Sequence, residues 1–94
     1  MSETTVHILN RGPNQAELLQ HLLDALAPGD AVVLIEDGVY WASSSLIECF
    51  GEQRPYVMGI DALARGVKHD QVNVIDDADF VDLCVTHRRS VSWC

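Results

Sequence analysis

The sequence predicts an α/β protein, a three-layer helix-sheet-helix sandwich around a small, mostly parallel sheet. Residues 31–35 form an unbroken apolar run (AVVLI), as expected for a strand whose two faces are both buried. An acidic turn, Glu36-Asp37-Gly38, follows this run directly. Short strand-like and helix-like segments alternate along the chain. Such alternation, with short connections, implies parallel strands joined by right-handed crossovers.

The first half of the chain predicts two strands and one helix. Residues 5–9 (TVHIL) are expected to form a strand, which the Gly and Pro of residues 10–14 end. Residues 15–27 predict a helix, because its leucines recur at helical spacing: Leu19, Leu22, Leu23 and Leu26. Residues 28–30 (PGD) end that helix, and the apolar strand at residues 31–35 follows.

The second half begins with a helix expected at residues 40–50, although its serine run favours helix poorly. Residues 55–60 predict the third strand. Asp61 is expected to cap a short helix at residues 62–65, which Gly66 ends.

The last elements are a strand at residues 72–75, a helix, and a short edge strand at residues 90–94. Acidic residues crowd the start of this helix and residues 87–89 (HRR) crowd its end, which complements the helix dipole. Its apolar residues are expected to form a buried stripe: Phe80, Val81, Cys84 and Val85.

Length and charge limit the classes of function. A chain of 94 residues with 48% hydrophobic residues predicts one small domain, which association with other subunits would stabilise. Its net charge of −8 repels phosphates, so we expect no direct nucleic-acid binding and a basic protein surface as partner. Three cysteines, no secretory signal and no membrane-length apolar run predict a cytoplasmic protein.

Two loops at predicted strand ends are candidate sites. Residues 10–12 (NRG) precede a helix, where an arginine and the helix start could hold an anion, but Pro13 favours an ordinary turn. Glu36 and Asp37 are adjacent acids, and neighbours in an extended segment point to opposite faces rather than toward one substrate. We expect this turn to be architectural, with Gly38 in an unusual backbone conformation.

The thiols and imidazoles give weaker signals. Cys84 and His87 have helical i, i+3 spacing, but a metal site needs more ligands, and the other histidines (His7, His21 and His69) lack matching spacing. We therefore expect no metal and no cofactor, and core packing for Cys84. Cys49 is expected to be structural. Cys94 is expected to be the most accessible thiol and is, with Cys49, a weak candidate for carrying sulfur.

Three stretches together resemble the DsrH/TusB family, the smallest subunit type of the DsrE-like sulfur-relay proteins. They are residues 7–13 (HILNRGP), residues 34–39 (LIEDGV), and residues 80–93, from Phe80 through His87 to Trp93. The resemblance spans nearly the whole chain. It implies a single DsrH/TusB-like domain over residues 1–94 with the DsrE-like fold.

The resemblance also implies partners. Members of this family act in a heterohexamer with TusC/DsrF-like and TusD/DsrE-like subunits, two copies of each. One version relays persulfide sulfur toward 2-thiouridine at the tRNA wobble position, and another serves the oxidation of stored sulfur. The sulfur-carrying cysteine belongs to the DsrE/TusD type, and some DsrH members also have one late in the first helix. Residues 20–23 (QHLL) contain none here, so no catalytic residue is transferred.

Three hypotheses follow. The first is a non-catalytic subunit of a TusBCD-like complex that supports sulfur transfer for tRNA thiolation, with a DsrEFH-like role in sulfur oxidation as its variant. The second is a sulfurtransferase that uses its own thiol, Cys94 or Cys49. The third is a self-associating binding module, a homo-oligomer without sulfur chemistry. Exposed thiols would favour the second, and a large apolar surface with buried thiols the first.

Overall fold

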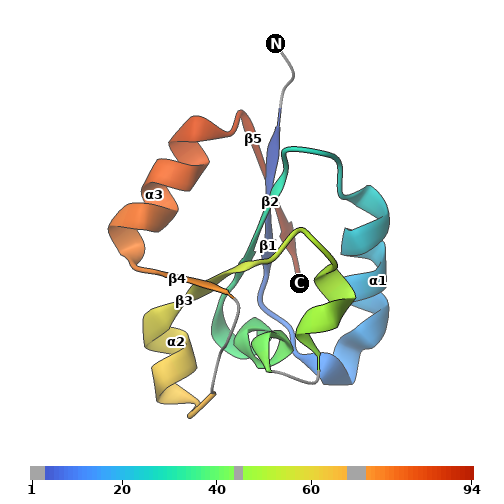
Figure 1. Ribbon diagram of the computed structural model, residues 1–94, viewed down its shortest axis with the longest axis vertical. Helices are drawn as coiled ribbons and strands as arrows, with labels where there is room; N and C mark the ends of the chain where they lie inside the picture. The colour runs from blue at the N-terminus through green and yellow to red at the C-terminus, as the bar shows by residue number, and fades with distance from the viewer. Residues whose placement is uncertain (1–3, 44–45, 68–71) are drawn as a thin grey trace.

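A computed structural model describes residues 4–43, 46–67 and 72–94, and these residues build a five-stranded sheet in which every paired strand is parallel (Figure 1). The strand order is β4-β3-β2-β1-β5. The strands are β1 Thr5–Leu9, β2 Ala31–Leu34, β3 Tyr56–Met58, β4 Asn73–Ile75 and β5 Arg89–Trp93. The predicted α/β class is confirmed. The strand expected at residues 90–94 is confirmed as β5, which pairs only with β1 among the described strands and forms one edge.

Helices cover both faces of the sheet, so the three-layer prediction is also confirmed. The α-helices are α1 Ala16–Ala25, α2 Gly59–Ala64 and α3 Asp77–Thr86, and α1 and α3 lie on opposite sides of the sheet (Figure 1). Three 3₁₀ helices complete the described elements: η1 Pro13–Gln15, η2 Glu36–Ala42 and η3 Ile47–Phe50. Among the described helices none has the length and apolar character needed to cross a membrane.

The main core lies between the sheet and the layer formed by α1, η2, η3 and α2. Leu19 and Leu22 of α1 are buried there, as their helical spacing predicts. A smaller cluster lies between the sheet and α3, where Phe80 and Leu83 pack against three buried side chains of the sheet: Val6, Val33 and Ile75. The larger cluster therefore determines most of the hydrophobic stabilisation.

The prediction of a single helix over residues 40–50 is wrong. The chain forms η2 and η3 instead, and Ser44 and Ser45 lie outside the described residues. Both short helices still bury their apolar residues, among them Trp41 and Phe50. Spacing of three residues fits one turn of 3₁₀ helix nearly as well as one of α-helix, so the apolar pattern alone does not separate the two.

The stripe expected on the last helix is also partly wrong. Val81 is 58% exposed and Val85 is 79% exposed, whereas Phe80 and Leu83 face the sheet. The small cluster beneath α3 is narrower than the apolar stripe of the helix, so only one side of the stripe is covered. The acidic helix start is confirmed: the Asp79 amide donates to Asp76 Oδ1 at 2.9 Å and the Asp76 amide to Asp79 Oδ2 at 3.2 Å.

The helix α2 begins directly after β3, earlier than expected. Asp61 therefore lies inside its first turn and is not its N-cap. The end of the helix is as predicted, since Gly66 has φ +64° just beyond it. Strand β3 is shorter than the run that predicted it, because α2 takes over residues 59 and 60, and β4 begins one residue later than predicted.

Candidate functional site at the carboxyl edge of the sheet

The carboxyl ends of the parallel strands meet at one edge of the sheet. In register, Leu9 lies opposite Leu34 of β2 and Trp93 of β5. The loops after β1 and β2 and the residue after β5, Cys94, therefore share this edge. Open α/β sheets bind their ligands at such an edge, which makes it the candidate site.

The loops after β1 and β2 touch at Gly38. A Cβ at this position would overlap the carbonyl oxygen of Leu9 and would lie 2.9 Å from its carbonyl carbon. The predicted unusual dihedral at Gly38 is wrong. The positive φ in this turn belongs instead to Glu36, at 49°. Glycine is needed at position 38 for space, and the Gly38 amide donates to the carbonyl of Ile35 at 2.8 Å.

The two adjacent acids of this turn lie against α2. Asp37 Oδ1 accepts a hydrogen bond from Arg65 Nε at 2.9 Å. That hydrogen bond is the main reason why the pKa of Arg65 is raised above its usual value. The Glu36 amide donates to Asp61 Oδ2 at 2.9 Å. These contacts fasten the turn to the helix that follows β3, as an architectural turn requires.

Residues 10–12 form the turn that Pro13 favours. The Trp41 indole Nε1 donates to the carbonyl of Arg11 at 3.0 Å, and the Gln15 amide donates to the carbonyl of Gly12 at 2.9 Å. The side chain of Arg11 is exposed at this edge. Within the described part of the chain, Asn10 Oδ1 is buried without a hydrogen-bond partner.

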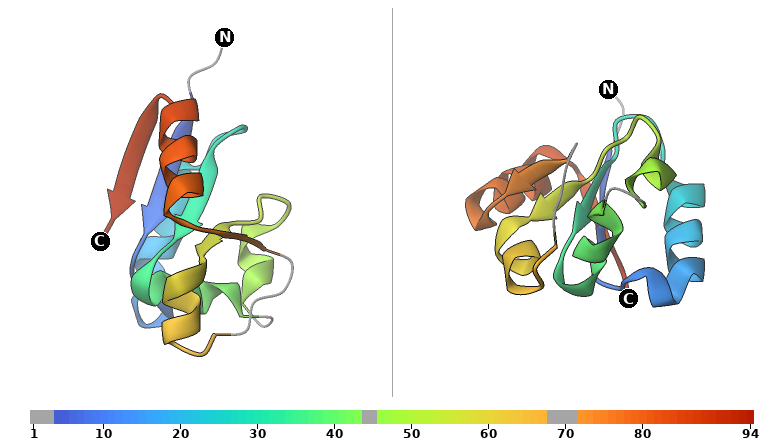
Figure 2. Two further views of the ribbon diagram at one scale, coloured as in Figure 1. Left: turned by 90° about the vertical axis from the view of Figure 1, so that its left-hand side faces the viewer. Right: turned by 60° about the horizontal axis from the view of Figure 1, so that its bottom comes forward.

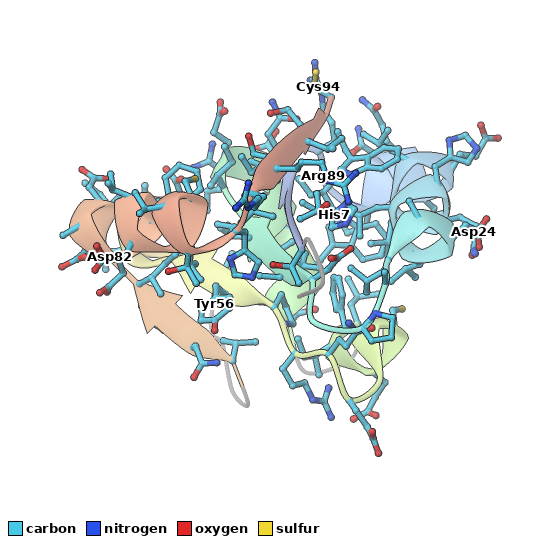
Figure 3. All side chains as sticks on the ribbon, turned by 90° about the horizontal axis from the view of Figure 1, so that it is seen from above. His7, Asp24, Tyr56, Asp82, Arg89 and Cys94 are labelled. Atoms are coloured by element: carbon cyan, nitrogen blue, oxygen red, sulfur yellow. The ribbon has the colours of Figure 1, made fainter. Side chains whose placement is uncertain are left out.

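The thiols differ in exposure. Cys49 on η3 and Cys94 after β5 are exposed, while Cys84 on α3 is half-buried. Figure 3 shows Cys94 at the periphery of the molecule, at the free end of β5. His87 Nδ1 donates to the Leu83 carbonyl at 2.9 Å. No three His, Cys, Asp or Glu side chains of the described residues are grouped to hold a metal ion, and His69 lies outside those residues.

A buried polar cluster that the sequence did not predict fastens β5 to the sheet. Trp93 Nε1 lies 3.1 Å from His7 Nδ1, and His7 Nε2 lies 2.8 Å from Asp30 Oδ2. An indole nitrogen only donates, so His7 Nδ1 accepts and His7 Nε2 donates to Asp30. A histidine in the middle of an apolar strand was the available signal, because a buried imidazole needs partners.

Asp30 supplies the carboxylate of this cluster, and its side chain is only 5% exposed. Burial is the largest influence on its pKa and raises it. Hydrogen bonds from His7, the Thr5 amide and the Ala27 amide act in the opposite direction and together hold the pKa of Asp30 below its usual 3.8. The Thr5 and Ala27 amides lie 2.9 Å and 3.0 Å from its carboxylate oxygens.

These features define a small α/β protein with an all-parallel sheet, whose carboxyl edge is closed by contacts between loops. A family model described as DsrH like protein matches residues 11–90, and the chain belongs to this family. This confirms the resemblance inferred from residues 7–13, 34–39 and 80–93.

Similar proteins agree with this assignment. The chain is 33% identical to Protein TusB of Photorhabdus laumondii, 34% to Protein TusB of Pectobacterium parmentieri and 30% to Protein TusB of Escherichia coli. Each alignment covers 94% of this chain and 99% of the relative. The solution NMR structure of Protein Tm0979 from Thermotoga maritima is 27% identical, with a TM-score of 0.67 over 87% of this chain and 92% of that one.

Proposed function

We propose that this chain is a non-catalytic subunit of a sulfur-relay complex. It would assemble with TusC/DsrF-like and TusD/DsrE-like subunits and support persulfide transfer toward 2-thiouridine at the tRNA wobble position. Similarity to proteins named TusB over nearly their whole length favours this role over a DsrEFH-like role in sulfur oxidation.

The observation that carries the proposal is the exposure of large aliphatic side chains on two helices of this chain. Ile60, Leu63 and Val85 are 72%, 82% and 79% exposed. Large aliphatic side chains exposed to this degree on two helices are typical of surfaces that other subunits cover.

The chemistry of the carboxyl edge also supports a non-catalytic role. Asp37 is paired with Arg65, and the carbonyl of Arg11 accepts from Trp41. General acid–base catalysis needs a carboxyl group free to approach a substrate. The Asp37 carboxylate, the Glu36 amide and the Arg11 carbonyl are thus engaged in contacts between neighbouring segments.

Co-expression with the TusC/DsrF-like and TusD/DsrE-like subunits of the same organism tests the proposal. We expect one complex with two copies of each chain by native mass spectrometry, and a loss of 2-thiouridine from tRNA when the gene for this chain is deleted. A chain that co-purifies with neither subunit, or a deletion that leaves 2-thiouridine unchanged, would contradict the proposal.

A second candidate function has its own observation. Cys94 is exposed at the carboxyl edge, as the hypothesis of a sulfurtransferase acting through its own thiol expects. In that reaction the Cys94 thiolate attacks the terminal sulfur of a donor persulfide. The donor S–S bond breaks, a new S–S bond forms on Cys94, and the donor leaves as a thiolate that takes up a proton. Mass spectrometry of the isolated chain after incubation with a persulfide donor would detect the added sulfur atom, and Cys94→Ser should abolish it.

A further inference from the structure

The helix α2 exposes its large apolar residues to solvent, which is the reverse of what is expected for a helix on the surface of an isolated domain. Its fully buried residue is the small Ala62, whereas its large aliphatic residues, Ile60 and Leu63, point outward and are 72% and 82% exposed. An amphipathic surface helix normally places its large apolar residues against the core. The outer side of α2 is thus the kind of surface expected inside an assembly.

The neighbouring strand β4 extends this surface to the edge of the sheet. Val74 of β4 is 48% exposed and lies against the start of α2, since a Cβ on Gly59 would lie 2.9 Å from Val74 Cγ1. β4 has three residues, and among the described strands it pairs only with β3. Figure 2 shows α2 and β4 together on the side of the molecule away from β5. We call Ile60, Leu63 and Val74 the α2–β4 face.

Acidic side chains border this face. Ile60 and Val74 line a surface hollow of about 430 Å³ together with three acids at the start of α3: Asp76, Asp77 and Asp79. Arg65, which directly follows α2, is already paired with Asp37. With a net charge of −8, a second copy of this chain would bring like charges together.

We propose that the α2–β4 face is the docking surface for the partner subunit, and that it binds an apolar patch bordered by lysine or arginine. The proposal rests on the proposed function, because that function supplies the partner. It adds which face of this chain is used and the charge of the surface that covers it. Apolar contact at the centre supplies the affinity, and the aspartates select against acidic surfaces and steer the encounter.

Matched substitutions test the face. Leu63→Glu adds a carboxylate at an 82% exposed helical position of the face, and His21→Glu adds one at an exposed helical position on α1. In the reconstituted complex we expect Leu63→Glu to weaken partner binding by more than roughly tenfold and His21→Glu to change it by less than about threefold. Ile60→Glu serves as a second variant of the face. Circular dichroism checks that each variant is folded.

The outcomes separate the two proposals. If the unmodified chain binds its partners and Leu63→Glu and Ile60→Glu bind equally well, the face is wrong while the proposed function stands. If the unmodified chain binds neither partner, both the docking face and the proposed function are contradicted. Asp77→Asn should also reduce the salt dependence of the association rate, because Asp77 lies outside the capping pair of α3. An unchanged salt dependence, or a second copy of this chain occupying the face, would overturn the basic-partner assignment.

Discussion

His7 is 3% exposed, and both of its ring nitrogens have a partner. The indole of Trp93 fixes the tautomer, because it gives His7 Nδ1 a donor and leaves Nε2 to donate to Asp30. The neutral imidazole therefore connects a loop carboxylate to the edge strand. Protonation at Nδ1 would remove the acceptor that Trp93 needs.

At the same scale, Asp30 predicts loss of stability in acid. Its pKa is lower in the folded chain than in the unfolded chain, so its contribution to stability is complete above the unfolded pKa of 3.8 and is lost as the pH falls through the folded pKa. Urea denaturation between about pH 5 and pH 2 should show this fall. Asp24→Asn on the exposed side of α1 is the matched control and should leave the pH dependence unchanged.

The Asp30→Asn variant removes the charge and should lower the free energy of unfolding at neutral pH by roughly 2–3 kcal/mol. In this variant, a side-chain amide nitrogen that faces His7 Nε2 could only donate to it. His7 already accepts from Trp93 at Nδ1, and a neutral imidazole cannot accept at both ring nitrogens. A variant that keeps both its stability at neutral pH and the acid-induced loss would contradict this assignment.

Gly38 gives a second prediction for a single residue. Gly38→Ala should destabilise the fold by about 3 kcal/mol, the upper end for overpacking, because the added methyl group meets the Leu9 backbone rather than a movable side chain. Gly66→Ala is the matched control. It has open space around it and φ +64°, so we expect only the cost of about 1–2 kcal/mol for a left-handed residue. Thermal unfolding should rank the two variants, and equal losses would argue against a steric role for Gly38.

At the scale of elements, the sequence predicted what local patterns determine. The burial of both faces of β2 and the leucine stripe of α1 follow from spacing alone, and both are found. The contacts that set the site were not predictable this way, because they join distant residues. His7 and Trp93 are separated by 86 positions, and the Glu36 amide meets a carboxylate 25 positions away, on Asp61.

The misassigned elements have the same cause. η2 begins at Glu36, which has a positive φ and whose amide donates to Asp61 of α2, a residue 25 positions further along the chain. On α3, the sequence shows an apolar stripe but not the width of the sheet surface that covers it. Val81 and Val85 therefore looked like core residues and are exposed.

The attachment of β5 gives a prediction for a whole element. Trp93→Phe keeps an aromatic ring but removes the donor to His7, which leaves a buried acceptor unpaired at a cost of about 1–3 kcal/mol. Because β5 is exposed along most of its length, this loss should appear as faster amide hydrogen exchange in β5, with β2 and β3 unchanged. Ser92→Ala in the same strand is the control and should exchange like the unmodified chain. Equal exchange in Trp93→Phe would mean that backbone pairing with β1 alone holds β5.

At the scale of the whole molecule, the exposed apolar surface and the exposed thiols favour different hypotheses. Buried thiols were expected for a subunit without its own sulfur chemistry, yet Cys49 and Cys94 are exposed. The apolar side chains on α2 and α3 still indicate an assembly. The two observations are compatible if the exposed thiols belong to a subunit whose partner carries the sulfur.

The last prediction is that no single cysteine of this chain is essential for sulfur transfer by the complex. Cys49 lies on η3, between η2 and β3, and Cys84 is half-buried late in α3, so neither directly follows the carboxyl end of a strand as Cys94 does. Cys49→Ser, Cys84→Ala and Cys94→Ser, each in the reconstituted complex, should load labelled persulfide sulfur within about twofold of the unmodified complex, a change of under roughly 0.5 kcal/mol. Size-exclusion chromatography confirms assembly in each case. If Cys94→Ser abolishes loading in a complex that still assembles, sulfur passes through the thiol at the end of β5, and the chain is a sulfurtransferase in its own right.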